Sequence, residues 1–345
     1  MPIFKSPIPP HQINVALEKA AITNHFTKRN VPRSQPGRLL LATWNIANLG
    51  AQGRTPQALE LIAHIMKRFD LIAVQEVNER FKFFLEIVNN MGPAFDYIMS
   101  DTAGNSERLA FIYRKQKVSL RNLFGEIALR MKEFPKRTVV VRYRDKGQEK
   151  QAIYSDVRFI PFDRNPFIGS FKAGTLDFTL VNVHLYFGKF QNSKKPEDHA
   201  KYCRRVLEIF ALSRWASKRK DSDKTFDTDI ILLGDMNVPA MEPEESTYKA
   251  LIKFGMQPIN YRTRTGGSNI RNNRTYDQVT FAPGTIEDKV LKCDVFDFDN
   301  AIFASLWKKI EAKYSSERKR NSEFNKHVQH HISDHRPVWI ELNIS

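Results

Sequence analysis

The sequence predicts one large α/β domain, and three observations support this fold class. Short, strongly apolar runs recur along the chain, as expected for buried strands. Between them lie stretches whose apolar residues are spaced as on one face of a helix. No internal repeat and no linker-like stretch follows residue 38. The length of 345 residues would allow two or three domains of roughly 100 to 200 residues each, but one domain over residues 38–345 is the simplest account.

The predicted elements follow one another from an N-terminal extension, residues 1–37, where six prolines surround one expected helix near residues 11–27. Six strands are expected from their content of branched and aromatic residues: LLLATWNIA (39–47), DLIAVQEV (70–77), LAFIYR (109–114), FTLVNVHL (178–185), DIILLGDMN (229–237) and VWIELNI (338–344). Two helices are expected where apolar residues recur at helical spacing: Ala58, Leu61, Ile62, Ile65 and Met66, then Cys203, Val206, Leu207, Phe210 and Trp215. We interpret both apolar stripes as core faces.

The amino-acid composition limits the classes of molecule that the protein is expected to bind. The chain has 54 Lys and Arg against 38 Asp and Glu, a formal net charge of +16, which favours polyanions such as nucleic acid or an anionic membrane surface. The alternative is a basic surface that serves only solubility. Two cysteines do not amount to a disulfide framework or a Cys/His metal pattern. Neither a signal peptide nor an apolar run near the roughly 20 residues of a membrane span is evident, so a cytoplasmic protein is expected.

Polar residues suited to chemistry stand at the ends of several predicted strands. They are Asn45, Glu76, His184, Asp235, Asn237, Asp334 and His335. Placing such groups at the ends of buried strands costs free energy unless something binds them. Two imidazoles and several oxygen ligands, without a thiolate cluster, suit a hard cation such as Mg²⁺ better than zinc. Taken alone, a Gly-Asp-x-Asn turn could equally be structural, because Asp and Asn also form turns and helix caps.

Together these motifs resemble the endonuclease/exonuclease/phosphatase superfamily, and its DNase I-like branch in particular. The resemblance runs from about Leu39 to Leu342 and rests on TWN, VQE, SER, VHL, GDMN, YDQ and SDH in the family's order. Each tripeptide is weak alone, but the ordered set is specific. The resemblance implies an α/β (α+β) fold of the DNase I-like type: a four-layer α/β/β/α sandwich of two packed mixed β-sheets flanked by helices. The active site would lie at one edge of the packed sheets.

The resemblance also implies a metal site and a pair of catalytic histidines. Glu76 matches the family's main metal ligand, and Asn45 and Asp334 would complete the surroundings of a Mg²⁺ ion, with Mn²⁺ as a substitute. His184 and His335 match the catalytic histidines, one activating water and the other protonating the leaving oxygen or stabilising the phosphate. Imidazole can perform either task near neutral pH. The sequence leaves open which histidine does which.

Each histidine is expected to have an orienting carboxylate. Asp277, in RTYDQV, matches the partner of the last histidine, and Glu107, in NSERLAFIYR, matches the partner of the first. The alternative for Glu107 is an exposed loop carboxylate. Asp235 and Asn237 would position the phosphate, the nucleophile or a second cation.

Substrate contacts are predicted at Arg164 and in a basic loop. Arg164, in FDRNPF, matches a phosphate-contacting arginine of the family, although a solvated loop arginine is the alternative. The stretch RTRTGGSNIRNNR (262–274) has four arginines and no acid, Arg262, Arg264, Arg271 and Arg274, and leads into Asp277. Ala47 and Asn78 stand where the DNA-digesting branch has DNA-contacting arginines. The segment between Arg114 and Asp163 looks longer than in that branch and is expected to form an extra basic hairpin.

The leading hypothesis is a Mg²⁺-dependent phosphodiesterase acting on nucleic acid, in particular a DNA endonuclease that leaves 5′-phosphate and 3′-hydroxyl ends. A second hypothesis keeps the fold but changes the substrate to a phospholipid or phosphoinositide, and abasic-site repair ranks below general nuclease activity. A third is a catalytically silent nucleic-acid-binding module. The presence of the whole residue set argues against the third.

Overall fold

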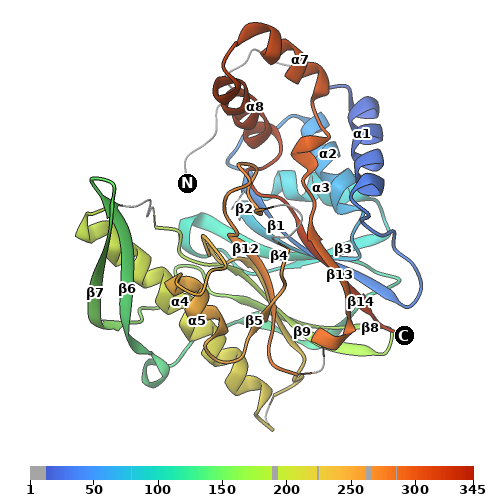
Figure 1. Ribbon diagram of the computed structural model, residues 1–345. Helices are drawn as coiled ribbons and strands as arrows, with labels where there is room; N and C mark the ends of the chain where they lie inside the picture. The colour runs from blue at the N-terminus through green and yellow to red at the C-terminus, as the bar shows by residue number, and fades with distance from the viewer. Residues whose placement is uncertain (1–12, 79, 189–192, 224, 262–265, 285) are drawn as a thin grey trace.

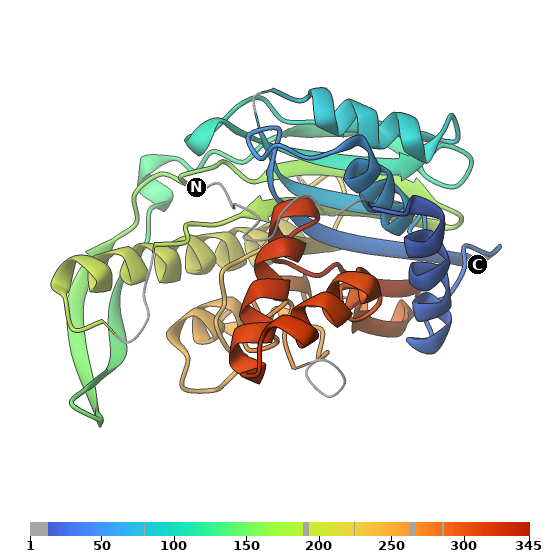
Figure 2. The same cartoon turned by 90° about the horizontal axis from the view of Figure 1, so that it is seen from above.

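The computed structural model describes residues 13–78, 80–188, 193–223, 225–261, 266–284 and 286–345. Two six-stranded β-sheets pack face to face, and helices cover their outer faces (Figures 1 and 2). Both sheets are mixed, because each contains one parallel pair of strands among antiparallel ones. The four-layer sandwich of the DNase I-like type is therefore confirmed.

The first sheet has the strand order β13-β14-β1-β2-β4-β3. Its strands are β1 (Arg38–Leu49), β2 (Leu71–Asn78), β3 (Phe95–Met99), β4 (Glu107–Arg114), β13 (Val290–Val295) and β14 (Val338–Asn343). Its outer face is covered by α1 (Val15–Lys28), α2 (Pro56–Met66) and α3 (Lys82–Met91) (Figure 1). Thr55 caps α2 by accepting a hydrogen bond from the backbone N–H of Ala58, and Pro56 occupies the first helical turn, where its missing N–H costs nothing.

The second sheet has the order β11-β12-β10-β9-β8-β5. Its strands are β5 (Ser119–Glu126), β8 (Phe167–Ala173), β9 (Leu176–His184), β10 (Ile230–Asp235), β11 (Gln257–Pro258) and β12 (Asp277–Phe281). Its outer face carries α4 (Pro196–Lys220) and α5 (Ser246–Ile252). Short 3₁₀ helices complete the chain: η1 (Gly104–Ser106), η2 (Met131–Glu133), η3 (Glu287–Lys289) and η4 (Phe298–Asn300).

The core consists of three apolar layers, which follow from the two-residue period of the strands. Along β1, Leu39 and Leu41 point between the two sheets, whereas Leu40 and Trp44 point toward the helices on the outer face. Because both faces of the sheets are buried, the central strands are apolar on both sides. This explains why their sequences are continuous apolar runs that could be recognised without the structure.

Three parts of the chain add to this sandwich. Helix α1 belongs to the core, since Ile22 and Phe26 are buried in the layer between the first sheet and its helices. Helices α7 (Ala304–Lys313) and α8 (Glu317–His331) lie side by side at the top of Figure 1. Strands β6 (Lys136–Asp145) and β7 (Gln148–Arg158) form the predicted extra hairpin, which projects beside α4.

The helices in the described part of the chain all lack the combination of length and hydropathy that a membrane span requires.

Candidate active site

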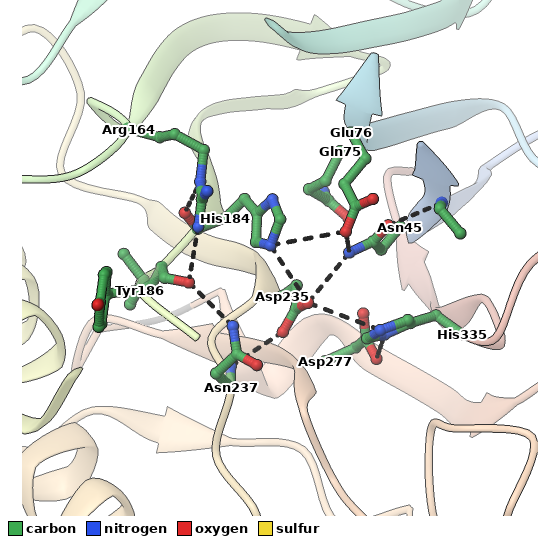
Figure 3. A network of polar contacts seen from close by, with 12 residues as sticks. Asn45, Gln75, Glu76, Arg164, His184, Tyr186, Asp235, Asn237, Asp277 and His335 are labelled. Carbon is green, nitrogen blue, oxygen red and sulfur yellow. Dashed lines mark hydrogen bonds and ion pairs between the residues drawn. The ribbon is translucent and has the colours of Figure 1, made fainter. Parts of the chain in front are cut away.

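Five strands bring polar residues to one edge of the sandwich. In the first sheet the parallel strands β1 and β2 carry Asn45 and Glu76 at their carboxyl ends. In the second sheet the parallel strands β9 and β10 end together, with His184 paired to Asp235. Asp277 lies opposite Asp235 at the start of the antiparallel neighbour β12. Because parallel neighbours end at the same edge, the two sheets bring residues far apart in sequence into one cluster (Figure 3).

The backbone at these strand ends is shaped for the site. Gly234 has φ of +138°, and a β-carbon there would lie 2.0 Å from the carbonyl oxygen of Val183 on the adjacent strand, so no larger residue fits. Glu76 and Asn237 have positive φ values of 61° and 54°, which L-residues adopt rarely and which concentrate at functional sites. The strand ends therefore turn sharply where their side chains enter the cluster.

The first histidine unit joins β4 and β9. Nδ1 of His184 lies 2.8 Å from Oε2 of Glu107, and both side chains are buried. The predicted pairing is present, and Glu107 is not the exposed loop carboxylate that was the alternative. Arg164 donates to the carbonyl oxygens of His184 and Leu185 at 2.8 and 3.1 Å, and its Nη1 lies 3.7 Å from Glu107 Oε1.

The second histidine unit joins β12 to the turn before β14. Nδ1 of His335 lies 2.8 Å from Oδ2 of Asp277, and the hydroxyl of Ser268 donates to the same oxygen at 2.7 Å. The backbone of His335 is fixed at both ends: its N–H donates to the Ser333 hydroxyl at 3.0 Å, and its carbonyl accepts from Trp44 Nε1 at 2.8 Å.

The two histidines have opposite pKa shifts. Burial, reinforced by the positive charge of Arg164, lowers the pKa of His184 to about 4. Burial also disfavours the charged form of His335, but Asp277 and then Asp235 outweigh it, so its pKa is raised well above the usual value. Burial raises the pKa of Glu107 to about 7, although Arg164 opposes the shift. Near neutral pH, His184 is therefore neutral and His335 is a cation.

Asp235 and Glu76 lie between the histidine units. Oδ2 of Asp235 is 3.6 Å from Nε2 of His184 and 3.8 Å from Nε2 of His335, so the free nitrogens of both rings face the same carboxylate. Asn45 Nδ2 donates to Glu76 at 2.8 Å and to Asp235 at 3.1 Å, bridging the two buried carboxylates. Burial raises the pKa of Glu76. Two carboxylates this close favour a cation between or beside them.

Among the described residues, few acidic and histidine side chains lie close enough together to share a metal ion. The one group of acidic and histidine ligand atoms that lie within 4.8 Å of one another consists of Asp235, Asp277 and His335. In that group His335 is already held by Asp277 and carries positive charge. The predicted ligands Glu76 and Asp334 instead line the cavity between the histidines, and Figure 3 shows Asn45 next to Glu76. Their oxygen donors suit a hard divalent cation.

Arg54 is a buried cation that the motif analysis missed. Its Nη2 donates to the carbonyls of Ile46, Ala47 and Ile332 at 2.7, 2.6 and 2.9 Å. It thereby ties the end of β1 to the turn that carries Asp334 and His335. Burial lowers its pKa to about 10, against the opposing charges of Glu76 and Asp334. The sequence GRTP gave no signal, because a carbonyl clamp of this kind depends on tertiary contacts.

A cavity of about 290 Å³ lies above these residues. Its lining includes the predicted residues Glu76, His184, Asp235, Asn237, Arg271, Asp334 and His335, and also Asn48, Phe187, Tyr276 and Gln329, which were not predicted. The ring of Tyr276 lies 6.1 Å from that of His335. Its position beside Asp277 was the available signal.

The predicted phosphate-contacting arginines differ in their positions. Arg271 is exposed and lines the cavity. Arg274 is partly buried, and its backbone N–H donates to Asn269. Arg164 is 3% exposed and lies beside His184, where it donates hydrogen bonds to backbone carbonyls (Figure 3). Arg262 and Arg264 lie outside the described residues. Asn237 also contacts this backbone, because its Nδ2 donates to the carbonyl of Leu185 at 2.9 Å.

Comparisons with known proteins point to one family. A sequence model described as the endonuclease/exonuclease/phosphatase family matches residues 42–278, more than half of the chain. Deoxyribonuclease gamma of Mus musculus is 21% identical over 212 residues, which cover 58% of this chain and 55% of that protein. The match therefore spans about half the length of this curated relative.

Solved structures with a similar chain path include two from Bacteroides thetaiotaomicron. An endonuclease/exonuclease/phosphatase family protein has a TM-score of 0.48 and 20% identity, over 89% of this chain and 95% of that chain. A mannosyl-6-phosphatase has a TM-score of 0.43 and 18% identity, over 88% of this chain and 99% of that chain.

Proposed function

The chain belongs to the endonuclease/exonuclease/phosphatase family, and on that premise we propose that it is a divalent-metal-dependent nuclease, specifically a DNA endonuclease that leaves 5′-phosphate and 3′-hydroxyl ends. Membership of the family, expected from the motifs, is confirmed by the match over residues 42–278. It makes the protein a hydrolase of phosphoester bonds. The substrate, the metal and the role of each residue are the proposal.

One observation carries the chemistry: the two histidines approach one point with their free Nε2 atoms, while their Nδ1 atoms are bound to separate carboxylates. A hydrogen bond from Nδ1–H to a carboxylate fixes the tautomer, so that Nε2 is the atom that exchanges a proton with the substrate. Neutral His184 is suited to accept a proton from the attacking water. Cationic His335 is suited to stabilise the phosphate and to give a proton to the leaving 3′ oxygen.

Mg²⁺ or Mn²⁺ would be held by Glu76 and Asp334, with Asn45 beside them. When bound, the cation would neutralise phosphate charge and polarise the phosphorus. Asp235 and Asn237 would orient the water and the phosphate between the two rings. The donor set fits such an ion, because the Asn45 amide holds the buried Glu76 and Asp235 carboxylates next to each other, and Oδ1 of Asp277 is buried without a hydrogen-bond partner among the described residues.

The positive net charge of the protein supports the proposal that its substrate is nucleic acid. The chain has a formal net charge of +16, and the exposed Arg271 stands at the rim of the cavity. Lys and Arg residues that neutralise backbone phosphates supply much of the affinity of nucleic-acid-binding proteins. The whole set of catalytic residues is present and assembled, which disfavours a catalytically silent binding module.

The test is nicking of supercoiled plasmid by the purified protein with Mg²⁺ or Mn²⁺, with EDTA and His335→Ala as controls. The proposal predicts nicking that requires both the metal and His335, and nicks that a DNA ligase reseals because their ends are 5′-phosphate and 3′-hydroxyl. If the folded protein leaves plasmid intact but hydrolyses phosphoinositides, sphingomyelin or sugar phosphates, the substrate assignment is wrong and the family chemistry stands.

A further inference from the structure

A second groove opens beside the catalytic cavity, walled by the two helices that precede His335. It has a volume of about 730 Å³ and lies between α7, α8, the 3₁₀ helix η4 and residues 270–272. It shares Ile270 and Arg271 with the catalytic cavity. A ligand whose phosphate sits between the histidines can therefore continue past Arg271 into this groove.

The groove combines aromatic, amide and cationic groups. Trp307 of α7 and Phe324 of α8 form an edge-to-face pair with ring centroids 5.4 Å apart, and both rings are partly exposed. Four asparagines also line it: Asn272, Asn300, Asn321 and Asn325. Exposed aromatic rings stack on nucleic-acid bases, and amide groups can hydrogen-bond to base edges.

The charge in the groove suits a phosphate backbone. Asp299 is neutralised by Arg336, which donates to both carboxylate oxygens at 2.7 Å. Among the described residues that line the groove, this leaves the exposed Arg271 and Lys308 against one remaining acid, Glu311. The Arg336–Asp299 pair also fixes the position of the groove, because it joins η4 to the residue that follows catalytic His335.

The position of the groove is supported from below by α1. The carboxylate of Glu18 accepts a hydrogen bond from the backbone N–H of Phe303 at 2.7 Å, immediately before α7 begins. Arg29 forms ion pairs with Asp294 and Asp297, both at 3.0 Å, at the start of the same connection. The segment that leads into α7 is thus held by α1, and Figure 2 shows the two helices, in orange and red, beside the sandwich.

We propose that this α7–α8 groove binds the single-stranded nucleotides that flank the scissile phosphate, with a base stacked on Trp307 and a flanking phosphate near Lys308. The proposal rests on the nuclease function and specifies its substrate. An unpaired strand is required, because a base within a duplex is already stacked and cannot reach an aromatic side chain. DNA and RNA share this chemistry, so the two are arms of the test.

The experiment compares steady-state cleavage of a dinucleotide, a 12-nucleotide single strand and a 12-base-pair duplex, in DNA and RNA versions. Trp307→Ala should reduce kcat/KM on the single strand by about 5- to 150-fold, the range expected for the loss of one base stacking on an aromatic ring. The loss should be smaller on the dinucleotide and on the duplex. Trp307→Phe keeps an aromatic ring against Phe324 and should recover part of the activity.

Matched control variants come from the same helices and from the far end of the molecule. Lys308→Ala should weaken single-strand cleavage and flatten its dependence on salt, whereas Lys309→Ala, whose side chain does not line the groove, should do neither. Phe226→Ala, an exposed aromatic before the start of β10 and therefore at the opposite end of that strand from Asp235, should match the wild type on all substrates. Circular dichroism and thermal unfolding establish that each variant is folded.

The possible results separate the two proposals. If the wild type cleaves single strands and Trp307→Ala cleaves them equally well, the groove assignment is wrong and the nuclease function stands. A loss of equal size on the dinucleotide and the 12-nucleotide strand also overturns it, because Trp307 would then act only through the shape of the catalytic site. If the wild type cleaves no nucleic acid under any condition, both proposals fail.

Discussion

The two histidine units of the catalytic edge are built alike and yet hold their protons differently. Each has a carboxylate on Nδ1 at 2.8 Å, and each lies on a backbone segment that a buried arginine holds, Arg164 for His184 and Arg54 for the turn before His335. Nevertheless, the pKa of His184 is lowered to about 4 and that of His335 is raised.

The difference lies in the surroundings of each pair and not in the pair itself. Arg164 is 3.7 Å from Glu107, so its charge acts directly on the first unit. Burial raises the pKa of Glu107 to about 7, so near neutral pH this partner is only partly ionised. A partly neutral carboxylate does little to stabilise a charged imidazole. The lesson is that a His–carboxylate distance alone does not establish the charge of the histidine.

The largest expected effect is the loss of either ring. His184→Ala and His335→Ala should each reduce kcat for plasmid nicking by about 10²- to 10⁴-fold, the usual contribution of a positioned acid or base. DNA retention in a gel-shift assay should persist in both. His64→Ala in α2, outside the cavity lining, is the control. Turnover at the wild-type level in either catalytic variant would remove that histidine from the mechanism.

Substitutions of the two orienting carboxylates, Asp277 and Glu107, should differ in their effect on kcat more than substitutions of the two histidines do. Asp277→Asn removes the charge that favours cationic His335 and should lower kcat by about 10- to 100-fold, as for other orienting partners. Glu107→Gln should cost less, because its pKa of about 7 makes the wild-type side chain partly neutral at that pH. Rate measurements at pH 7 on both variants test the order. An equal or larger loss for Glu107→Gln would contradict the asymmetry.

The two arginines should differ in stability. Arg54→Met leaves three buried carbonyl groups without their donor, and we expect a loss of about 3 kcal/mol in the free energy of unfolding. Arg164→Met removes the donor of two carbonyls and should cost less. Urea unfolding measures both. If Arg54→Met is as stable as the wild type, the clamp between β1 and the His335 turn is not energetically significant.

The smallest expected effect is the difference between the titration curves of His184 and His335. NMR measures the protonation of each imidazole ring, with EDTA present to keep metal ions out of the site. His184 should stay neutral down to about pH 4, and His335 should stay charged well above pH 6.5. Unfolded histidine titrates near 6.5, so as pH falls below that value the neutral His184 destabilises the fold. Charged His335 stabilises the fold below pH 6.5, and this contribution disappears as pH rises through its raised pKa. Coincident titration of the rings would refute the comparison.

The sequence predicted the central strands of the two sheets better than the strands and helices at their edges. The six predicted strands all exist, because strands buried on both faces are continuous apolar runs. Edge strands such as β3 and β13 were missed, since partly exposed strands carry mixed residues. Helices α7 and α8 were also missed as structural elements. Most of their surface is charged and exposed, so no apolar stripe marked them.

The candidate catalytic residues could be picked out from short sequence motifs, whereas the residues that support them could not. Residues such as Glu107 and Asp277 fall within recognisable tripeptides, and the structure places each beside its histidine. Arg54 and Ser268 act through contacts with segments distant in sequence. No local sequence pattern predicts such contacts. The opposite pKa shifts of the two histidines likewise depend on residues that are distant in sequence, such as Arg164 and Asp235.

Gly234 sets a limit on how this edge can vary. A methyl group at this position would overlap the backbone of β9, and that strand cannot retreat without shifting His184, which closes its end. Any substitution at position 234 would therefore displace either Asp235 or His184 from its position in the site. In a mutational library selected for turnover, position 234 should accept only glycine, while the apolar residues just before it tolerate exchange among themselves. The glycine of the GDMN motif is thus required because β9 and β10 lie too close together to leave room for a side chain at this position.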